Sequence, residues 1–292
     1  MLVPYDDRDG WIWLDGRWTQ WRDARVHVLT HGLHYASAVF EGTRAYGGHI
    51  FACEAHTARL FASAQALNMD VPYNQDEINR ITRECLTKNN LTDAYIRPLV
   101  WRGPEQMGVA GLATKVHVMV AAWAWPSYFS PEQHARGLRL MDAPYRRVPP
   151  MSAPIHAKAS GLYMTSTLIK QAAEQQGFDD AMVLDWRGHV AEACVANLFF
   201  IKDGALHTPV PDAFLNGITR QTVIELAKKR GIAVHERTIL QEEVPGFDQA
   251  FLTGTAAEVA PIGEIAGHKF SLGGLAMQLA DDYAQHVRNP SL

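Results

Sequence analysis

The chain has 292 residues, of which 27 are Lys or Arg and 31 are Asp or Glu, and its formal net charge is −4. This balance excludes the dense basic surface of a nucleic-acid-binding protein and gives no attraction to an anionic membrane. Hydrophobic residues make up 47% of the sequence, enough to fill one large core or two medium ones.

The N-terminus and the cysteines indicate the compartment. Residues 1–10 lack the basic start and apolar centre of a signal peptide, and no apolar run reaches membrane-spanning length. Cys53, Cys85 and Cys194 are odd in number and scattered, with no Cys-x-x-Cys pair, which favours a reducing compartment over a disulfide framework. We therefore expect a cytoplasmic protein.

The first half of the chain alternates strand and helix signals. Asp15-Gly16 and Gly47-Gly48 are typical of tight hairpin turns, and Asn74 with Glu77 forms a capping-box pattern before a helix. In chain order we predict hairpins at 11–21 and around 47–48, helices at 54–69 and 74–89, and strands at 95–101 and 116–124.

The stretch from Pro126 to Pro131 interrupts this pattern, because neither proline can donate to a strand ladder. We place a linker at 126–134 between two α/β or α+β domains, residues 1–125 and 135–292. The second domain is predicted to have strands at 138–142, 181–185, 198–202 and 206–208, a strand ending at 253, a hairpin at 263–267, and helices at 161–176, 219–230 and from 274, with a proline-rich loop at 144–154.

Lys158 lies among small and apolar residues, and Glu192 follows 34 positions later. Desolvation makes a lysine easier to deprotonate, which suits a Schiff-base nucleophile, and a carboxylate can keep a pyridine nitrogen protonated. Together the two residues suggest pyridoxal phosphate chemistry. Either one alone is more typical of a solvated surface charge.

Two segments have the features of anion-binding loops. Leu215 to Arg220 stands directly before an amphipathic helix, where the backbone of Gly217 and Ile218 and the hydroxyl of Thr219 can bind a phosphate. The alternative is an ordinary loop with Thr219 as the N-cap. The segment 253–257 ends a strand with small residues that let an anion approach the backbone, or it is a bare turn.

Three further side chains are candidates for binding anions. Arg59 lies near the apolar stripe of its predicted helix, although a surface position is the plain alternative. Tyr95 and Arg97 alternate along a strand, so both point to one face, where a phenol and a guanidinium can bind a carboxylate. A surface cross-strand pair is the other interpretation.

The spacings His31-x-x-His34 and Cys53-x-x-His56 resemble zinc-ligand pairs. We favour ordinary interior residues, because the second pair opens a helix and both residue types are frequent in cores. No metal site is predicted.

Nearly the whole chain resembles the branched-chain amino acid aminotransferase family of fold type IV pyridoxal phosphate enzymes. The family's long signature is matched by residues from Glu192 through Asn197 and Leu215 to Arg220, and upstream segments at 34–42 and 95–98 resemble its substrate-pocket segments. The resemblance implies a two-domain α/β (α+β) fold with the cofactor, pyridoxal 5′-phosphate, at the domain interface. It also implies a homodimer or a higher homo-oligomer.

The resemblance assigns a role to each matched position. Lys158 is then the catalytic Schiff-base lysine, Glu192 the partner of the pyridine nitrogen, and Tyr163 the partner of the phenolic oxygen. Leu215 packs on the cofactor ring, and the phosphate is bound by Arg59, Gly217, Ile218, Thr219 and Thr255. The substrate carboxylate is bound by Tyr95, Arg97, Thr255 and Ala256, and its side chain by Tyr35, Phe40, Trp125 and Tyr128.

The implied reaction is transamination of branched-chain L-amino acids with 2-oxoglutarate, through a Lys158 aldimine and with ping-pong kinetics. Three positions depart from the family pattern: Gln106, Ala196 and Asn216. The rivals are a D-amino acid or (R)-amine transaminase, an aminodeoxychorismate lyase of the same fold, and a non-enzymatic binding protein in which Lys158 and Glu192 form a structural ion pair.

Overall fold

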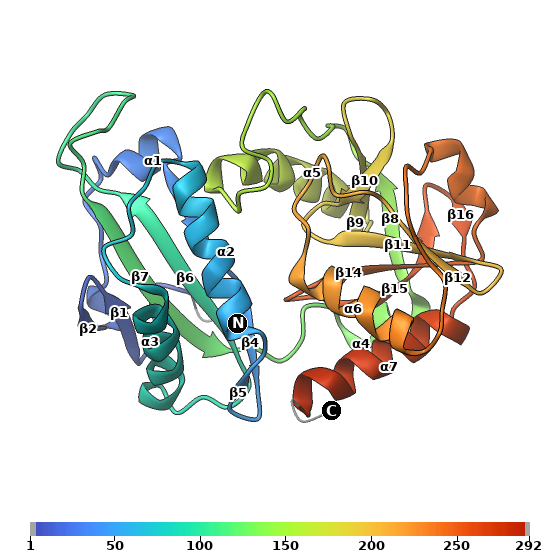
Figure 1. The fold of residues 1–292 in the computed structure, drawn as a ribbon, viewed down its shortest axis with the longest axis horizontal. Coiled ribbons are helices and arrows are strands. Elements are labelled where there is room, and N and C mark those ends of the chain that lie inside the picture. The colour runs from blue at the N-terminus through green and yellow to red at the C-terminus, as the bar shows by residue number, and fades with distance from the viewer. Residues whose placement is uncertain (1–3, 290–292) are drawn as a thin grey trace. The chain divides into compact units, whose positions relative to one another are not determined.

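The computed structural model describes residues 4–289. Residues 1–3, part of the segment compared with signal peptides, lie outside this range. The chain divides into two compact units. The N-terminal unit contains residues up to Pro126 together with Ala157–Leu162, and the C-terminal unit contains Ser127–His156 and the residues from Tyr163 onward (Figure 1). Lys158 therefore belongs to the N-terminal unit, whereas chain order had placed it in the predicted 135–292 domain.

The N-terminal unit is built on a seven-stranded sheet of order β2-β1-β7-β6-β4-β5, with β3 also paired to β6 and every pairing antiparallel. Its strands are β1 (Trp11–Leu14), β2 (Arg17–Gln20), β3 (Ala38–Phe40), β4 (Thr43–Tyr46), β5 (His49–Ile50), β6 (Ala94–Arg102) and β7 (Val116–Ala124). Both predicted hairpins are confirmed. Asp15, Gly16, Gly47 and Gly48 all have positive φ, as two-residue primed turns require.

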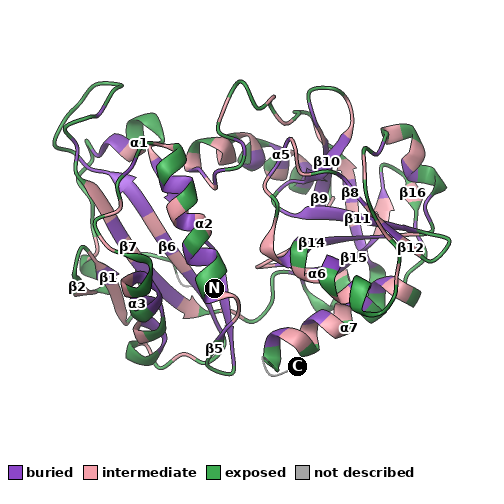
Figure 2. Ribbon diagram, in the orientation of Figure 1, coloured by how far each residue is buried: buried purple, intermediate pink, exposed green. Residues whose placement is uncertain are grey.

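Two long helices pack on this sheet, α2 (Cys53–Ala66) and α3 (Gln75–Lys88). Their buried faces share one core with the strands, while their outer faces are exposed (Figure 2). The predicted capping box is confirmed, because the Glu77 N–H donates to Asn74 Oδ1 over 2.9 Å and the Asn74 N–H donates to Glu77 Oε2 over 2.8 Å. The short helix α1 (His31–Tyr35) and the 3₁₀ turn Trp21–Asp23 were not predicted.

The sheet is interrupted between β3 and β4, at Glu41 and Gly42. Phe40 pairs with Leu99 and Thr43 pairs with Ile96, so Glu41 stands opposite Pro98. The Glu41 N–H donates to the Pro98 carbonyl over 2.9 Å, but proline has no N–H to return the bond. The strand pairing is therefore broken at Glu41-Gly42.

The C-terminal unit contains a nine-stranded sheet of order β10-β9-β8-β15-β14-β11-β12-β13, with β16 on β15. Because β10 pairs with both β9 and β11, six of these strands form a closed circuit. The strands are β8 (Leu138–Asp142), β9 (Asp180–Leu184), β10 (Val190–Ala193), β11 (Asn197–Lys202), β12 (Ala205–Thr208), β13 (Val234–Glu236), β14 (Gln249–Gly254), β15 (Glu258–Ile265) and β16 (His268–Lys269).

The helices of this unit are α4 (Pro131–Arg136), α5 (Tyr163–Gln175), α6 (Ile218–Lys229) and α7 (Gly274–Arg288). Helices α6 and α7 pack on each other and on β14 and β15, while α5 packs on β9 (Figure 1). The three helices predicted here, α5, α6 and α7, are confirmed to within two residues at their starts. Helix α4 was not predicted, because residues 131–134 were taken as linker.

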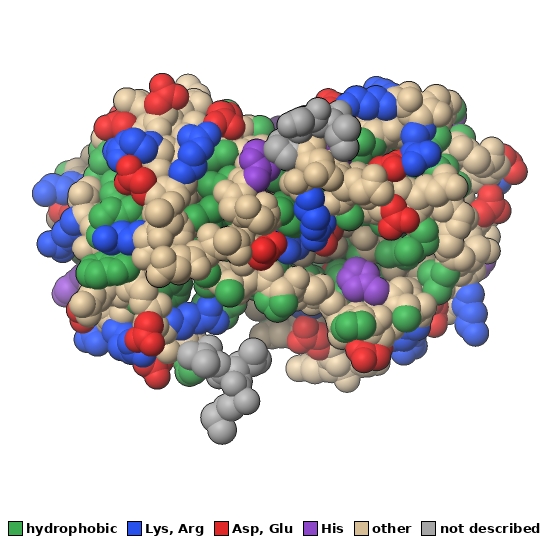
Figure 3. Space-filling model, turned by 90° about the horizontal axis from the view of Figure 1, so that it is seen from below, with side chains coloured by type: hydrophobic (Ala, Val, Ile, Leu, Met, Phe, Trp, Pro, Cys, Tyr) green, Lys and Arg blue, Asp and Glu red, His purple; other side chains and the backbone are tan. Residues whose placement is uncertain are grey.

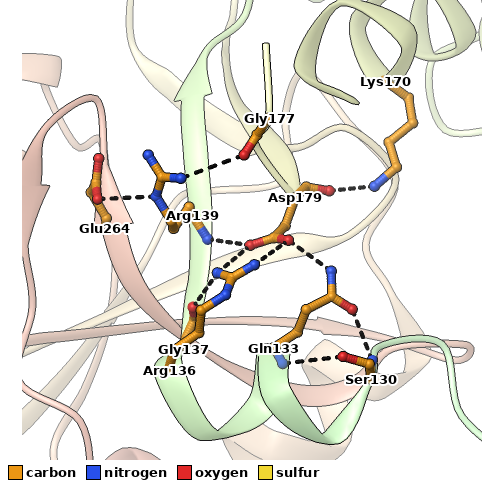
Figure 4. A network of polar contacts seen from close by, with 9 residues as sticks. All are labelled: Ser130, Gln133, Arg136, Gly137, Arg139, Lys170, Gly177, Asp179 and Glu264. Atoms are coloured by element: carbon orange, nitrogen blue, oxygen red, sulfur yellow. Dashed lines mark hydrogen bonds and ion pairs between the residues drawn. The ribbon is translucent and has the colours of Figure 1, made fainter. Parts of the chain in front are cut away.

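A buried carboxylate explains why α4 is ordered. Asp179 accepts hydrogen bonds from Gln133 Nε2, from both terminal nitrogens of Arg136 and from the Arg139 N–H, each at 2.7–2.8 Å (Figure 4). Ser130 and Gln133 add a capping box at the start of the helix. These contacts join α4 to β8 and to the start of β9.

On the face drawn in Figure 3, Lys and Arg side chains are interspersed with Asp and Glu side chains. Within residues 4–289, no helix is both long enough and apolar enough to span a membrane.

Candidate functional site

The backbone of Lys158 is fixed on both sides. Its N–H donates to Ser63 Oγ on α2 over 3.0 Å, and its carbonyl accepts from the Phe40 N–H over 3.1 Å. The neighbouring Ala157 and Ala159 are both buried. Lys158 Nζ lies 5.1 Å from the centroid of the Phe40 ring. The lysine is thus attached to an apolar core at a defined position.

Arg59 contacts a buried carboxylate in the same unit. Its Nε donates to Glu41 Oε1 over 2.6 Å and its Nη2 donates to Glu41 Oε2 over 2.9 Å. His56 Nδ1 contacts the same Oε2 over 2.7 Å. Burial disfavours ionisation of Glu41, but the charge of Arg59 and the hydrogen bonds from His56 and Arg59 hold the pKa of the carboxyl well below its ordinary value.

Tyr95 and Arg97, which were expected on one face of their strand, are in contact. Arg97 Nη2 donates to Tyr95 Oη over 3.2 Å, and the Arg97 guanidinium lies 4.6 Å from the Phe40 ring centroid. The Trp125 ring lies 5.2 Å from that of Tyr95. Four residues predicted to bind substrate therefore lie together in the N-terminal unit.

Two other predicted pocket residues have neighbours outside this group. Tyr35 ends α1 against the His31 ring and is 42% exposed. Tyr128 belongs to the C-terminal unit, where its ring packs against Phe129 and lies 5.8 Å from Lys170 Nζ.

In the C-terminal unit, Glu192 lies on β10 and is mostly buried. Arg147 donates from Nε to Glu192 Oε1 over 2.8 Å, from Nη1 to Ser166 Oγ over 3.2 Å, and from Nη2 to the Cys194 carbonyl over 2.6 Å. The guanidinium therefore fixes one oxygen of the carboxylate to the backbone of the same unit.

The segment before α6 is fixed by Asn197. Its Nδ2 donates to the Leu215 carbonyl over 3.0 Å, and its Oδ1 accepts from the Gly217 N–H over 3.2 Å. A Cβ on Gly217 would stand 2.3 Å from that oxygen, so this close approach requires glycine. Helix α6 starts at Ile218 with Gly217 as its N-cap. The alternative that Thr219 is the N-cap is wrong.

A glycine N-cap has no side chain that could accept from the first N–H groups of α6. These N–H groups therefore point out of the N-terminal end of the helix, where an anion can accept from them. The buried Thr219 hydroxyl lies 3.4 Å from Tyr283 Oη. The other small-residue segment forms a turn at residues 255–257 after β14, as its sequence indicated. Both segments keep the features of anion-binding loops.

The three departures from the family pattern have structural roles. Asn216 Oδ1 accepts from Arg220 Nη1 over 3.0 Å, and Gln106 Oε1 accepts from the Ala113 N–H over 2.9 Å. Ala196 is buried, with its Cβ 3.6 Å from the place where a side chain on Gly254 would start.

The residues of the suspected zinc pairs have other partners. His31 Nε2 contacts the Gly108 carbonyl and His34 Nε2 contacts the Val28 carbonyl, both at 2.9 Å. Cys53 Sγ lies 3.5 Å from Asn79 Oδ1. These contacts account for both spacings without a metal.

The chemistry of these groups fits pyridoxal phosphate. Lys158 has an amine that would react with an aldehyde, and Glu192 has a carboxylate that would pair with a pyridine nitrogen. Arg59 and the start of α6 each have donors that would suit a phosphate. The sequence analysis assigned no positioning role to the residues that fix these groups, namely Glu41, Arg147 and Asn197, although Glu41 and Asn197 lie in segments that match the family. Glu41 also had a signal of its own, because a carboxylate inside the apolar run 38–42 needs a partner.

Residues 38–265 match the family model for class IV amino-transferases. The branched-chain-amino-acid aminotransferase of Pseudomonas aeruginosa is 48% identical over 271 residues, covering 91% of this chain and 88% of the relative. That of Escherichia coli K12 is 39% identical over 265 residues, covering 88% and 85%.

Solved structures of branched-chain aminotransferases have a similar fold. The branched-chain aminotransferase of Thermoproteus uzoniensis with norvaline has a TM-score of 0.92 at 34% identity, covering 97% of this chain and 98% of that one. The branched-chain amino acid aminotransferase of Thermobaculum terrenum in its PLP-form has a TM-score of 0.88 at 30% identity, covering 96% and 94%. This chain therefore belongs to the class IV aminotransferase family and has the fold of its type IV pyridoxal phosphate enzymes.

Proposed function

We propose that this chain is a branched-chain-amino-acid aminotransferase that uses pyridoxal phosphate to transfer the amino group of leucine, isoleucine or valine to 2-oxoglutarate. The observation that carries this conclusion is the 48% identity, over 91% of the chain, to an enzyme of that name. The relatives and structures compared above are named for the branched-chain reaction, which favours it over the D-amino acid, (R)-amine and lyase alternatives.

When bound, pyridoxal phosphate supplies an electron sink for the bonds at the substrate α-carbon. Lys158 Nζ would hold the cofactor through its aldehyde carbon. As a free amine, the same nitrogen would carry a proton between the substrate α-carbon and that cofactor carbon, in one direction in the first half-reaction and in the other direction in the second. The fixed backbone of Lys158 limits the positions that this amine can reach, which favours proton transfer.

Glu192 would keep the pyridine nitrogen protonated, and Arg147 supports this role by orienting the carboxylate and satisfying one of its oxygens. Tyr163 would donate to the phenolic oxygen, and Leu215 would pack on the ring. The proposed phosphate ligands are Arg59, Gly217, Ile218, Thr219 and Thr255.

The substrate carboxylate is bound by Tyr95 and Arg97, with the turn amides at Thr255 and Ala256. The hydrogen bond between Tyr95 and Arg97 directs both groups to one place. The aliphatic side chain contacts the rings of Tyr35, Phe40, Trp125 and Tyr128, whose apolar faces suit branched hydrocarbon groups. Phenol and guanidinium groups at the edge can also accept the γ-carboxylate of glutamate.

The test replaces Lys158 with alanine. The purified protein should show a visible absorbance band of bound cofactor that L-leucine bleaches and D-alanine does not. Lys158→Ala should lose both that band and transamination, whereas the matched control Lys269→Ala, at an exposed lysine of β16, should keep both. Transamination by Lys158→Ala above about one hundredth of the wild-type rate would remove Lys158 from its role, since a positioned general base contributes about 10²–10⁴-fold. Bleaching by D-alanine alone would favour the D-selective alternative.

We also propose a cytoplasmic homodimer or larger homo-oligomer. Cys53, Cys85 and Cys194 are buried with free thiols, which supports a reducing compartment. Light scattering after size-exclusion chromatography measures the oligomeric state.

A further inference from the structure

Glu41 is a carboxylate with 0% exposure, and both of its oxygens are engaged. Oε1 accepts from Arg59 Nε. Oε2 accepts from Arg59 Nη2, from His56 Nδ1 and, at 3.2 Å, from the Gly42 N–H. A buried carboxylate is costly unless its charge and lone pairs are matched in this way.

The contact with Arg59 is directional. Glu41 engages the Nε and Nη2 edge of the guanidinium with two nearly parallel bonds, so the plane of the group is fixed. The other edge, formed by Nη1 and the second hydrogen of Nη2, is then directed away from Glu41. An arginine fixed along one edge can present its second edge to an anion without losing side-chain freedom at that moment.

The backbone places Glu41 in this position. Glu41 stands at the gap in strand pairing opposite Pro98. Its two side-chain partners come from one face of α2, since His56 and Arg59 are three residues apart. Buried ion pairs are weak contributors to stability compared with apolar packing. A pair that links a broken strand to a predicted phosphate ligand therefore calls for a functional explanation.

We propose that Glu41 is a positioning residue for the cofactor phosphate and that it acts through Arg59. By binding the Nε and Nη2 edge of the guanidinium, Glu41 directs the donors of the other edge toward the phosphate. The inference rests on the proposed role of Arg59 in binding phosphate. Glu41 itself touches neither the cofactor nor the substrate. Its contribution should therefore appear in affinity for the phosphate group and not in affinity for the rest of the cofactor.

The experiment compares cofactor binding to apoenzyme variants. Apo forms of wild type, Glu41→Gln, Arg59→Met and the double variant are titrated with pyridoxal phosphate and, separately, with pyridoxal, which lacks the phosphate. We expect Glu41→Gln to weaken pyridoxal phosphate binding by about 10–100-fold, the usual range for a residue that orients a ligand-binding group. Pyridoxal binding should change by less than about threefold.

The double variant tests the route of the effect. In the Arg59→Met background, Glu41→Gln should weaken pyridoxal phosphate binding by less than about threefold further, because the group it positions is already gone. His56→Gln is the matched control, because it removes another partner of Glu41 while leaving both bonds to Arg59. It should weaken binding by less than about fivefold.

Three results would overturn the proposal. Equal weakening of pyridoxal and pyridoxal phosphate binding by Glu41→Gln would show a purely structural role. An undiminished effect of Glu41→Gln in the Arg59→Met background would show that Glu41 does not act through Arg59. Unchanged pyridoxal phosphate binding by Glu41→Gln would show that no positioning is needed. If Arg59→Met alone leaves pyridoxal phosphate binding unchanged, the assignment of Arg59 as a phosphate ligand fails instead.

Circular dichroism of each apo variant checks its fold. Should Glu41→Gln not fold, Arg59→Lys replaces it, because lysine keeps the charge but cannot form the two-nitrogen contact with Glu41. The proposal then requires a loss of pyridoxal phosphate affinity of at least about tenfold in Arg59→Lys, with pyridoxal affinity retained.

Discussion

Gly42→Ala is the smallest change that tests how the strand break shapes the substrate site. A Cβ at position 42 would stand 1.8 Å from Tyr95 Oη and 2.7 Å from Tyr95 Cζ. Ordinary contact begins at 3.4 Å, so the hydroxyl must move by about 1.6 Å. Tyr95 is buried, with its ring 5.3 Å from that of Trp123 and 5.2 Å from that of Trp125, which leaves little room for it to move.

Two effects of different size follow from this displacement. Overpacking a filled core lowers the free energy of unfolding by about 1–3 kcal/mol. A shift of about 1.6 Å also removes any hydrogen bond from Tyr95 Oη to the substrate carboxylate, and a bond to a charged group is worth about 1.5–3 kcal/mol. Since about 1.4 kcal/mol corresponds to a factor of ten, the KM for L-leucine should rise by roughly 10–100-fold.

Steady-state kinetics and urea denaturation of the holoenzyme measure both effects. The control is Gly246→Ala, where the added Cβ meets only the end of the Lys202 side chain at 3.7 Å and should change neither quantity. Tyr95→Phe in the Gly42→Ala background removes the atom with the worst overlap and should restore part of the lost stability. A normal KM in Gly42→Ala would refute the placement of Tyr95 at the substrate carboxylate.

Two further predictions concern buried charged groups. Burial, together with the charges of Arg59 and Lys158, lowers the pKa of His56 even though Glu41 raises it. In the unfolded chain a histidine takes up a proton near pH 6.5, so unfolding binds a proton below that pH. The free energy of unfolding of the apoenzyme should therefore fall as the pH is lowered from about 6.5 to 5.5. His56→Gln should reduce this pH dependence by up to about 1.4 kcal/mol per pH unit. If urea denaturation at these two pH values gives the same pH dependence for His56→Gln as for wild type, the burial argument is contradicted. Arg147→Met should lower the free energy of unfolding by about 3 kcal/mol, because it removes the cation that is paired with the buried Glu192 carboxylate. Arg80→Ala, which breaks the exposed pair with Glu84, should cost less than about 0.5 kcal/mol. Equal losses in urea denaturation for Arg147→Met and Arg80→Ala would refute the assigned burial of the Glu192 pair.

The sequence predicts elements best where local chemistry decides them. The two hairpins depend on Asp15-Gly16 and Gly47-Gly48, and the start of α3 depends on Asn74 and Glu77, so each signal lies within a few residues of the structure it specifies. Helix α4 was missed because its order depends on Asp179, more than 40 residues away, and not only on the local capping box.

The same distinction separates functional groups from the residues that position them. Lys158, Glu192 and the 215–220 segment could be predicted as functional groups because residue type and chain neighbourhood indicate their chemistry. Arg147 was missed because it lies in a proline-rich loop whose path to Glu192 follows from the pairing of β8, β9 and β10. Long-range contacts of this kind depend on strand register, which a single sequence specifies only weakly.

Glu41 shows how a local signal and a long-range one combine. A glutamate within an apolar run indicates that a buried cation is needed, but it does not indicate which one. Pro98 removes the one N–H that would have continued the ladder, and the resulting gap places Glu41 within reach of the face of α2 that bears His56 and Arg59. An arginine for which the sequence alone favoured a surface position thereby becomes a fixed donor. The missing N–H of Pro98 thus determines how Arg59, a proposed phosphate ligand, is held. A search for positioning residues in related chains can therefore begin at prolines inside strands.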